Sequence, residues 1–221
     1  MSKVFLIHGS MVGVPSFYKS PQAITQQLED GMYSIFREEL KNNNPDYHLY
    51  KWMPQHDASE RLNPTADLTS YYHEQSMVIT DELQKSLSIE LNAHMPTVVV
   101  AHSMGCELLI NMINNYSLPE SVKSIITINS DSPEDKRILD TTVINRLKSK
   151  DLKFINLHSI TDITLMTSVV LNKMVPRAGL KGYTSKLIEN RSINIFGNHN
   201  LSLTMPEVKK IILDETLQGF K

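Results

Sequence analysis

Three residue types that can carry out nucleophilic and acid–base chemistry follow apolar stretches of this chain. Residues 97–105 read TVVVAHSMG, so a run of β-branched residues leads straight into Ser103. Asp162 comes shortly after the apolar stretch that ends at His158, and His199 follows the stretch SINIF. A hydroxyl, a carboxylate and an imidazole form a triad in which the histidine takes the hydroxyl proton and the acid orients the histidine. These residues therefore predict acyl transfer through an activated serine.

The apolar stretches themselves are predicted to be strands of a parallel sheet. Most are short and fully apolar, and helical patterns separate them, which is typical of strands buried on both faces of an α/β fold. In such sheets, functional side chains collect at the carboxyl ends of the strands. The six expected strands are Val4–Ile7, Tyr47–Trp52, Thr97–Ala101, Ser124–Asn129, Lys153–His158 and Ser192–Phe196.

Apolar residues at helical spacing predict the helices between these strands. The expected helices are Pro21–Lys41, Glu74–Leu91, one beginning behind Ser103, Pro133–Lys150 with Ser132 as its N-cap, Ile163–Val175 and Pro206–Leu217. The proline-containing stretch from Met53 to about Tyr72 is expected to be a loop.

Composition narrows the class of protein. The 221 residues suit one large domain, and we expect a single unit over residues 1–221. A net charge of −2 argues against nucleic acid or an anionic membrane as the main partner. No apolar run is long enough for a membrane span, the N-terminus does not resemble a signal peptide, and the single cysteine excludes an internal disulfide. A cytoplasmic location is the expectation.

The residues around Ser103 fit a nucleophile elbow, the sharp strand-to-helix turn that exposes a catalytic serine. Such a turn needs small residues two positions before and after the serine, and here these are Ala101 and Gly105. The alternative is that Ser103 only caps the following helix. Cys106 is the rival nucleophile, but it lies inside the helix and is expected to be a packing residue.

His199 is the expected general base and Asp162 the expected acid beside it. Asp131, which follows the preceding strand, is the alternative acid. We favour Asp162 because the order serine, acid, histidine then follows the strands along the chain. His8 is expected to orient the first loop, and His102 to point away from the turn.

Two backbone amides are expected to bind the oxyanion that forms during acyl transfer. One is the amide of Met104, directly after the serine, at the start of a helix whose dipole favours negative charge. The other belongs to the loop HGSMVG after the first strand, at Ser10 or, alternatively, Met11.

Taken together, the segments FLIHGSMVG, VVVAHSMG, the Asp162 loop and GNHNLSL resemble the α/β-hydrolase superfamily, and within it the small bacterial lipases and esterases with a minimal six-stranded sheet. The resemblance implies a single-domain α/β-hydrolase fold, a central, mostly parallel six-stranded sheet with helices on both faces. It also implies Ser103, Asp162 and His199 as the triad and the amides of Ser10 and Met104 as the oxyanion hole. The stretch around 163–190 is longer than a minimal lipase needs. It is either a cap-like insertion over an acyl pocket or an ordinary amphipathic segment on the sheet.

The expected activity is hydrolysis of carboxylic esters of small-molecule substrates through an acyl-enzyme, with no metal or organic cofactor. A thioesterase or an acyltransferase would use the same triad, as would a cofactor-free lyase or haloperoxidase-like enzyme. A non-catalytic binding protein of the same fold is the alternative from a different class.

Overall fold

The computed structural model describes residues 3–9, 36–42, 44–52, 64–193 and 199–218. Its centre is a six-stranded sheet in the order β2-β1-β3-β4-β5-β6, in which every neighbouring pair is parallel. The strands are β1 (Val4–Ile7), β2 (Tyr47–Tyr50), β3 (Val98–His102), β4 (Ser124–Ile128), β5 (Lys153–His158) and β6 (Glu189–Ser192). The expected α/β class with a parallel six-stranded sheet is therefore confirmed.

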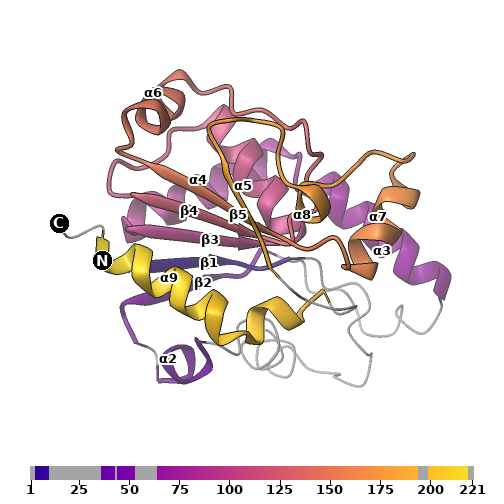
Figure 1. The fold of residues 1–221 in the computed structure, drawn as a ribbon, viewed down its shortest axis with the longest axis horizontal. Helices are drawn as coiled ribbons and strands as arrows, with labels where there is room; N and C mark the ends of the chain where they lie inside the picture. The colour runs from indigo at the N-terminus through magenta and orange to yellow at the C-terminus, as the bar shows by residue number, and fades with distance from the viewer. Residues whose placement is uncertain (1–2, 10–35, 43, 53–63, 194–198, 219–221) are drawn as a thin grey trace.

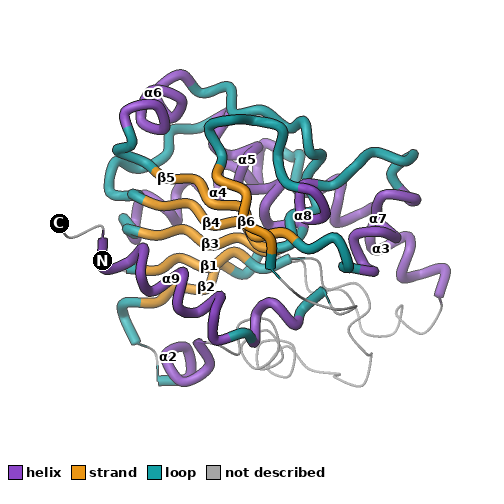
Figure 2. Tube along the Cα trace, in the orientation of Figure 1, coloured by secondary structure: helices purple, strands orange, loops and turns teal. Residues whose placement is uncertain are grey.

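Helices cover both faces of this sheet (Figure 1). Those in the described part of the chain are α2 (Arg37–Lys41), α3 (Pro64–Met77), α4 (Asp81–His94), α5 (Met104–Asn115), α6 (Thr141–Ser149), α7 (Ile163–Leu171), α8 (Ala178–Lys181) and α9 (Pro206–Gln218). A 3₁₀ turn, η4, spans Leu201–Thr204. Figure 2 shows the strands as one layer between α9 on one face and α4 and α5 on the other.

The alternating side chains of the strands divide the core into two halves. Val99 and Ala101 of β3 pack with β1 side chains toward α4 and α5. Val98 and Val100 face the other way, toward the buried side chains of α9. Burial on both faces explains why β3 is a continuous run of buried residues. Ser103 follows directly where this strand ends, at His102.

The last strand differs from the prediction. β6 pairs with β5 over Glu189–Ser192, so the expected strand Ser192–Phe196 began too late, and its residues 194–196 lie outside the described part. The observed strand is polar because it is an edge strand, where apolar residues are not required. It is held instead by the Asn190 side chain, which accepts from the amide of Tyr183 (2.8 Å) and donates to its carbonyl (2.9 Å).

Three predicted helices were also wrong in extent, and the one expected over Ile163–Val175 ends at Leu171. The expected helix Glu74–Leu91 is two helices, α3 and α4, and α3 begins at Pro64 in the stretch predicted to be a loop. At the break, the carbonyl of Val78 accepts hydrogen bonds from the side chains of Asn111 (3.1 Å) and Gln84 (3.3 Å). These long-range bonds compensate for the lost helical ones, and the local apolar spacing does not reveal them.

The expected helix Pro133–Lys150 is confined to α6. Asp140 is its N-cap, accepting from the amide of Val143 at 2.7 Å, so Ser132 does not have the capping role predicted for it. In the described residues, no helix has the length and apolar character needed to cross a membrane.

Candidate active site

Ser103 occupies a strained turn between β3 and α5. Its backbone dihedrals are φ 53° and ψ −124°, a region that residues other than glycine rarely adopt and that is found where the surrounding structure enforces it. Its side chain makes no capping hydrogen bond to α5. The alternative interpretation of Ser103 as an ordinary helix cap is therefore not supported by its geometry.

Gly105, two residues after Ser103, and Gly9, at the end of β1, allow two chain segments to approach the serine closely. A methyl group on Gly105 would lie 2.3 Å from the carbonyl oxygen of His8, and one on Gly9 would lie 2.6 Å from Cβ of Ser103. Both distances are shorter than van der Waals contact, so neither site can accept a side chain without movement. The end of β1 is thus packed directly against the turn that carries Ser103.

Asp162 and His199 form a buried pair. One carboxylate oxygen of Asp162 accepts from the amide of Leu165 (3.1 Å) and caps α7, while the other lies 2.6 Å from Nδ1 of His199. Asp162 is 1% exposed and His199 8% exposed. Because the carboxylate is an acceptor, it selects the tautomer in which Nδ1 carries the proton and Nε2 has the free lone pair.

The backbone of His199 is held by residues that the sequence interpretation did not assign to the site. Asn129, at the end of β4, donates from Nδ2 to the carbonyl of His199 (2.7 Å) and to the hydroxyl of Ser202 (3.0 Å). Asn129 has a positive φ of 46°, which an asparagine tolerates better than most residues. A polar residue at the end of the apolar stretch SIITIN was the available signal for this role.

The imidazole of His199 lies against His102, the residue that precedes Ser103; the two ring centroids are 4.7 Å apart. Nε2 of His199 is buried and has no hydrogen-bond partner among the described residues, so the Ser103 hydroxyl is not bonded to it. His102 is fully buried, and this burial, together with nearby His199, keeps the pKa of His102 well below its usual range. His102 is therefore a neutral packing residue beside the pair.

Asp131, the alternative acid, lies in a different network. Its backbone amide donates to the carbonyl of Ser103 (3.1 Å), but its carboxylate accepts from the hydroxyls of Tyr71 (3.1 Å) and Ser168 and pairs with Nε of Arg177 (3.4 Å). Burial raises the pKa of Asp131, and Arg177 opposes this rise. The network joins α3, α7 and the start of α8 to the end of β4, and it leaves Asp162 as the acid beside His199.

His8 holds the end of β1 in place. Its Nδ1 donates to the carbonyl of Gly9 (2.7 Å), its Nε2 accepts from the amide of Trp52 (3.3 Å), and its ring stacks on the indole at 5.2 Å. Burial lowers the pKa of His8 to about 4, so the ring is neutral at physiological pH. From Ser10 on, the loop that His8 is predicted to orient lies outside the described residues, so this role stays a prediction.

Met104, Ser10, Met11 and Cys106 are the other residues predicted to belong to the site or to compete with it. Met104 is buried at the first position of α5, where its amide belongs to the helix N-terminus behind Ser103. Ser10 and Met11 lie outside the described residues. The Cys106 thiol contacts the carbonyl of Ala101 (3.2 Å), and burial raises its pKa to about 12, so it is a poor nucleophile.

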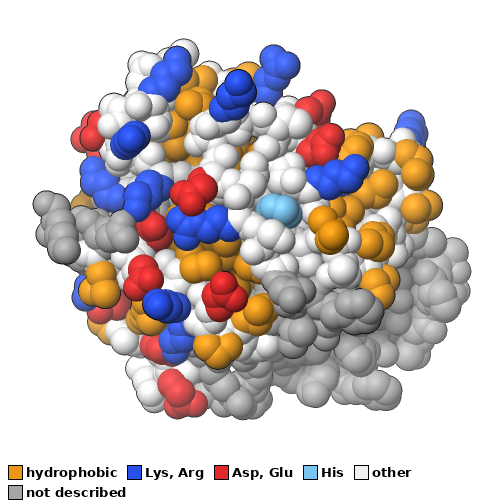
Figure 3. All heavy atoms as spheres, in the orientation of Figure 1, with side chains coloured by type: hydrophobic (Ala, Val, Ile, Leu, Met, Phe, Trp, Pro, Cys, Tyr) orange, Lys and Arg blue, Asp and Glu red, His pale blue; other side chains and the backbone are white. Residues whose placement is uncertain are grey.

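Two alternatives, a cap and a packed amphipathic helix, are predicted for the segment around 163–190. α7 buries Leu165 and Ser168 and exposes Ile163, Met166 and Val170. Figure 3 shows hydrophobic side chains gathered on the face of the molecule over α7. α7 lies beyond the carboxyl ends of the strands beside α3, where the Tyr72 hydroxyl donates to the carbonyl of Leu171 (3.2 Å).

Among the described residues, the group of side chains suited to metal ligation is His48, Glu90 and His94, and it contains none of the residues around Ser103. The chain was also compared with models of protein families and with curated protein sequences, and neither comparison found a match.

Proposed function

We propose that this protein is a serine hydrolase that cleaves carboxylic esters, with Ser103 as nucleophile, His199 as general base and Asp162 as the acid that orients it. The observation that carries the proposal is the buried Asp162–His199 pair, whose ring packs beside the strained turn of Ser103. Nε2 of His199 supports it further: this buried atom has no hydrogen-bond partner among the described residues, and a catalytic role accounts for such a costly arrangement.

In the proposed reaction, the Ser103 oxygen attacks the ester carbonyl while Nε2 of His199 takes the hydroxyl proton. Asp162 stabilises the imidazolium that forms. The tetrahedral intermediate collapses, and the alcohol leaves with the proton from His199. Water then attacks the acyl-enzyme, again losing its proton to His199, and the acid is released. The reaction needs no group other than the three side chains and the amides that bind the oxyanion.

The amide of Met104 is the proposed oxyanion donor in the described residues, and Ser10 is the proposed second one. A donor of this kind contributes about 3 kcal/mol to transition-state stabilisation in comparable sites. α5 adds the positive end of its dipole at the same point. The hydrogen bond between the Ser103 hydroxyl and Nε2 of His199 is proposed to form in the substrate complex, as catalytic hydrogen bonds often do.

The substrate class rests on the apolar surface near the site. Exposed apolar side chains of α7 and the residues flanking it are available to contact an acyl chain, and they include Ile160, Met174 and Val175. Asp162 is the N-cap of the same helix, so this surface is joined to the proposed triad by the chain itself. Esters with apolar acyl groups are the proposed substrates.

Covalent labelling tests the proposal directly. A fluorophosphonate probe should label the wild-type protein at Ser103, and the protein should hydrolyse p-nitrophenyl butyrate. Ser103→Ala should lose both properties and keep its thermal stability. Ser149→Ala, at an exposed position at the end of α6, is the matched control and should behave as wild type.

Three outcomes would contradict the proposal or redirect it. Retained turnover in Ser103→Ala would exclude this serine as the nucleophile, and a wild-type protein that neither reacts with the probe nor turns over substrate would favour a binding protein of the same fold. Faster turnover of acyl-thioesters than of matched oxygen esters would change the substrate to a thioester.

A further inference from the structure

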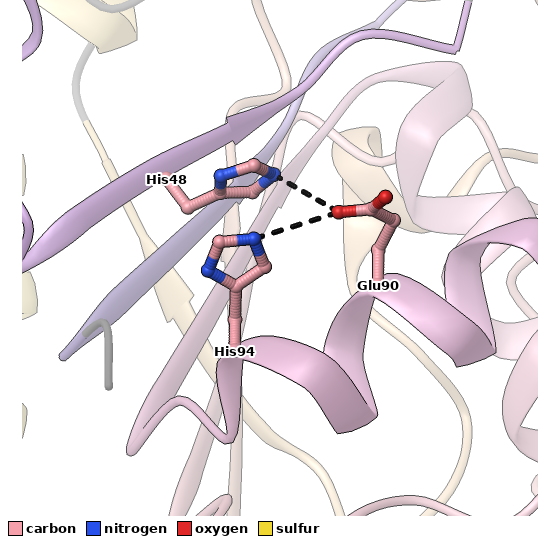
Figure 4. A group of neighbouring side chains, drawn as sticks. All are labelled: His48, Glu90 and His94. Carbon is pink, nitrogen blue, oxygen red and sulfur yellow. Dashed lines mark ion pairs between the residues drawn. The ribbon is translucent and has the colours of Figure 1, made fainter.

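A second cluster of side chains lies at the edge of the sheet, away from Ser103. It consists of His48 on β2 and of Glu90 and His94 on α4, which Figure 4 shows pointing toward one another. Glu90 and His94 are four residues apart and therefore share one face of the helix. His48 is on the same face of β2 as Tyr50, whose hydroxyl donates to Ser86 of α4 (3.0 Å), so helix and strand run side by side here.

The ligand atoms of the three side chains converge. Nε2 of His48 lies 3.6 Å and Nε2 of His94 3.5 Å from the same oxygen of Glu90, and all three atoms lie within 4.8 Å of one another. These separations exceed the roughly 2.7–3.2 Å of a good hydrogen bond. They are close to the separation of about 3.3–3.4 Å between neighbouring ligands of a tetrahedral ion with bonds of about 2.0–2.1 Å.

The two rings are placed in advance by buried packing. Phe5, which is fully buried, has its ring centroid 4.9 Å from that of His48 and 5.9 Å from that of His94. The two imidazoles lie against each other at 3.7 Å with their planes tilted by 29°. Preorganised ligands of this kind lose little freedom on binding an ion.

Exposure also fits a ligated ion. The side chains of His48, Glu90 and His94 are 27%, 41% and 31% exposed, which gives an ion access from solvent and leaves room for a water ligand.

We propose that His48, Glu90 and His94 bind a divalent transition-metal ion, such as Zn²⁺, that links the edge strand β2 to α4. Two imidazoles and one carboxylate suit zinc and its neighbours in the first transition row, whereas Mg²⁺ and Ca²⁺ prefer oxygen ligands alone. His48 is in register with Phe5 and Phe5 with Val99, which is four residues before Ser103 on β3. The site is therefore separate from the proposed triad and does not depend on the proposed function.

The role that follows is stabilisation of the sheet edge. β2 has four residues, and within the described part of the chain it pairs with a strand on one side, β1. An ion bound to both β2 and α4 would cross-link this strand to the helix that covers it. Because the ion binds the folded arrangement, it should raise the thermal stability of the protein.

The test uses the full-length, untagged chain after removal of metals with EDTA and buffer exchange. Titration calorimetry with ZnCl₂ should give one saturable site, and Co²⁺ should give the visible absorption of a tetrahedral complex. Glu90→Gln and His94→Gln should each weaken Zn²⁺ binding by about tenfold or more, as removing a ligand-shell residue commonly does. His73→Ala, at an exposed histidine outside the cluster, is the control and should bind as wild type.

Thermal unfolding provides the second readout. Zn²⁺ should raise the Tm of the wild type and of His73→Ala, but not of Glu90→Gln, and excess Mg²⁺ should leave both the affinity and the Tm unchanged. Glu90 is partly exposed, so Glu90→Gln is expected to fold even if a histidine variant does not. Absence of saturable Zn²⁺ binding to the wild type, or equal affinity in Glu90→Gln, would overturn the proposal.

Discussion

Asp162 and His199, thirty-seven residues apart, are joined by a hydrogen bond of 2.6 Å between a carboxylate oxygen and Nδ1. The same carboxylate caps α7, so the position of the helix and the orientation of the imidazole depend on one side chain. Asp131, which follows the neighbouring strand, also carries a buried carboxylate but binds Tyr71, Ser168 and Arg177. The two acids differ in their partners and should therefore differ in the effects of substitution.

Asp162→Asn should reduce kcat for ester hydrolysis by roughly 10²- to 10⁴-fold, because an amide no longer selects the tautomer with a free Nε2. Asp131→Asn should instead leave Arg177 buried without its partner and reduce the free energy of unfolding by about 3 kcal/mol. Urea unfolding and steady-state kinetics of both variants measure the contrast. A larger loss of kcat in Asp131→Asn than in Asp162→Asn would contradict the assignment.

Gly105→Ala tests the close approach of β1 to the turn at Ser103. In an isolated helix this change would stabilise by about 1 kcal/mol, because alanine is the better helix former. Here the added methyl group would meet the carbonyl oxygen of His8 at 2.3 Å, so we expect destabilisation by about 1–3 kcal/mol and loss of ester hydrolysis as Ser103 shifts. Urea unfolding gives the sign directly, and a stabilised, active variant would show that the turn is not constrained.

Much of this fold is predictable from the sequence because burial on both sides leaves a clear signal. The central strands β3 and β4 are runs of apolar residues, and such runs with helical patterns between them predict a parallel sheet. Residues that follow the strands of a parallel sheet lie at one edge of it, which is how Ser103, Asp162 and His199, each placed after a predicted strand, could be selected. Their catalytic roles remain predictions.

The parts that were predicted wrongly or overlooked depend on contacts between distant residues. Helical spacing continues across Val78, but side chains from α4 and α5 bind its carbonyl and allow the helix to end there. The edge strand β6 has no apolar pattern to detect. Asn129 and Arg177 acquire their roles only when strands and helices far apart in sequence meet. Local patterns contain no information on such pairs.

Cys106 should be unreactive in the folded protein, although it lies only three residues from Ser103. It is fully buried and its pKa is raised to about 12 by that burial, so almost no thiolate exists at neutral pH. Iodoacetamide should modify the thiol in urea but not under native conditions, as measured by mass spectrometry. Cys106→Ala should keep its ester hydrolysis. Inactivation of the native protein by the reagent would show that this thiol is accessible.

His8 should make the stability of the protein depend on pH. The folded-state pKa is about 4, whereas the unfolded value is about 6.5. On acidification the unfolded chain therefore binds a proton at this position before the folded one does. The stability associated with a neutral His8 is fully present above about pH 6.5 and is lost as the pH falls toward 4, by about 3 kcal/mol in total.

His8→Gln removes this titration. The variant should be less stable than the wild type at neutral pH, because it loses the stacking on Trp52, but its stability should fall less steeply between about pH 6.5 and 4. His102, whose pKa is lowered in the same direction, accounts for part of the slope that remains. Urea unfolding at several pH values, followed by the fluorescence of Trp52, the single tryptophan, measures both curves. Parallel curves for the two proteins would mean that His8 does not change its protonation on unfolding in this range.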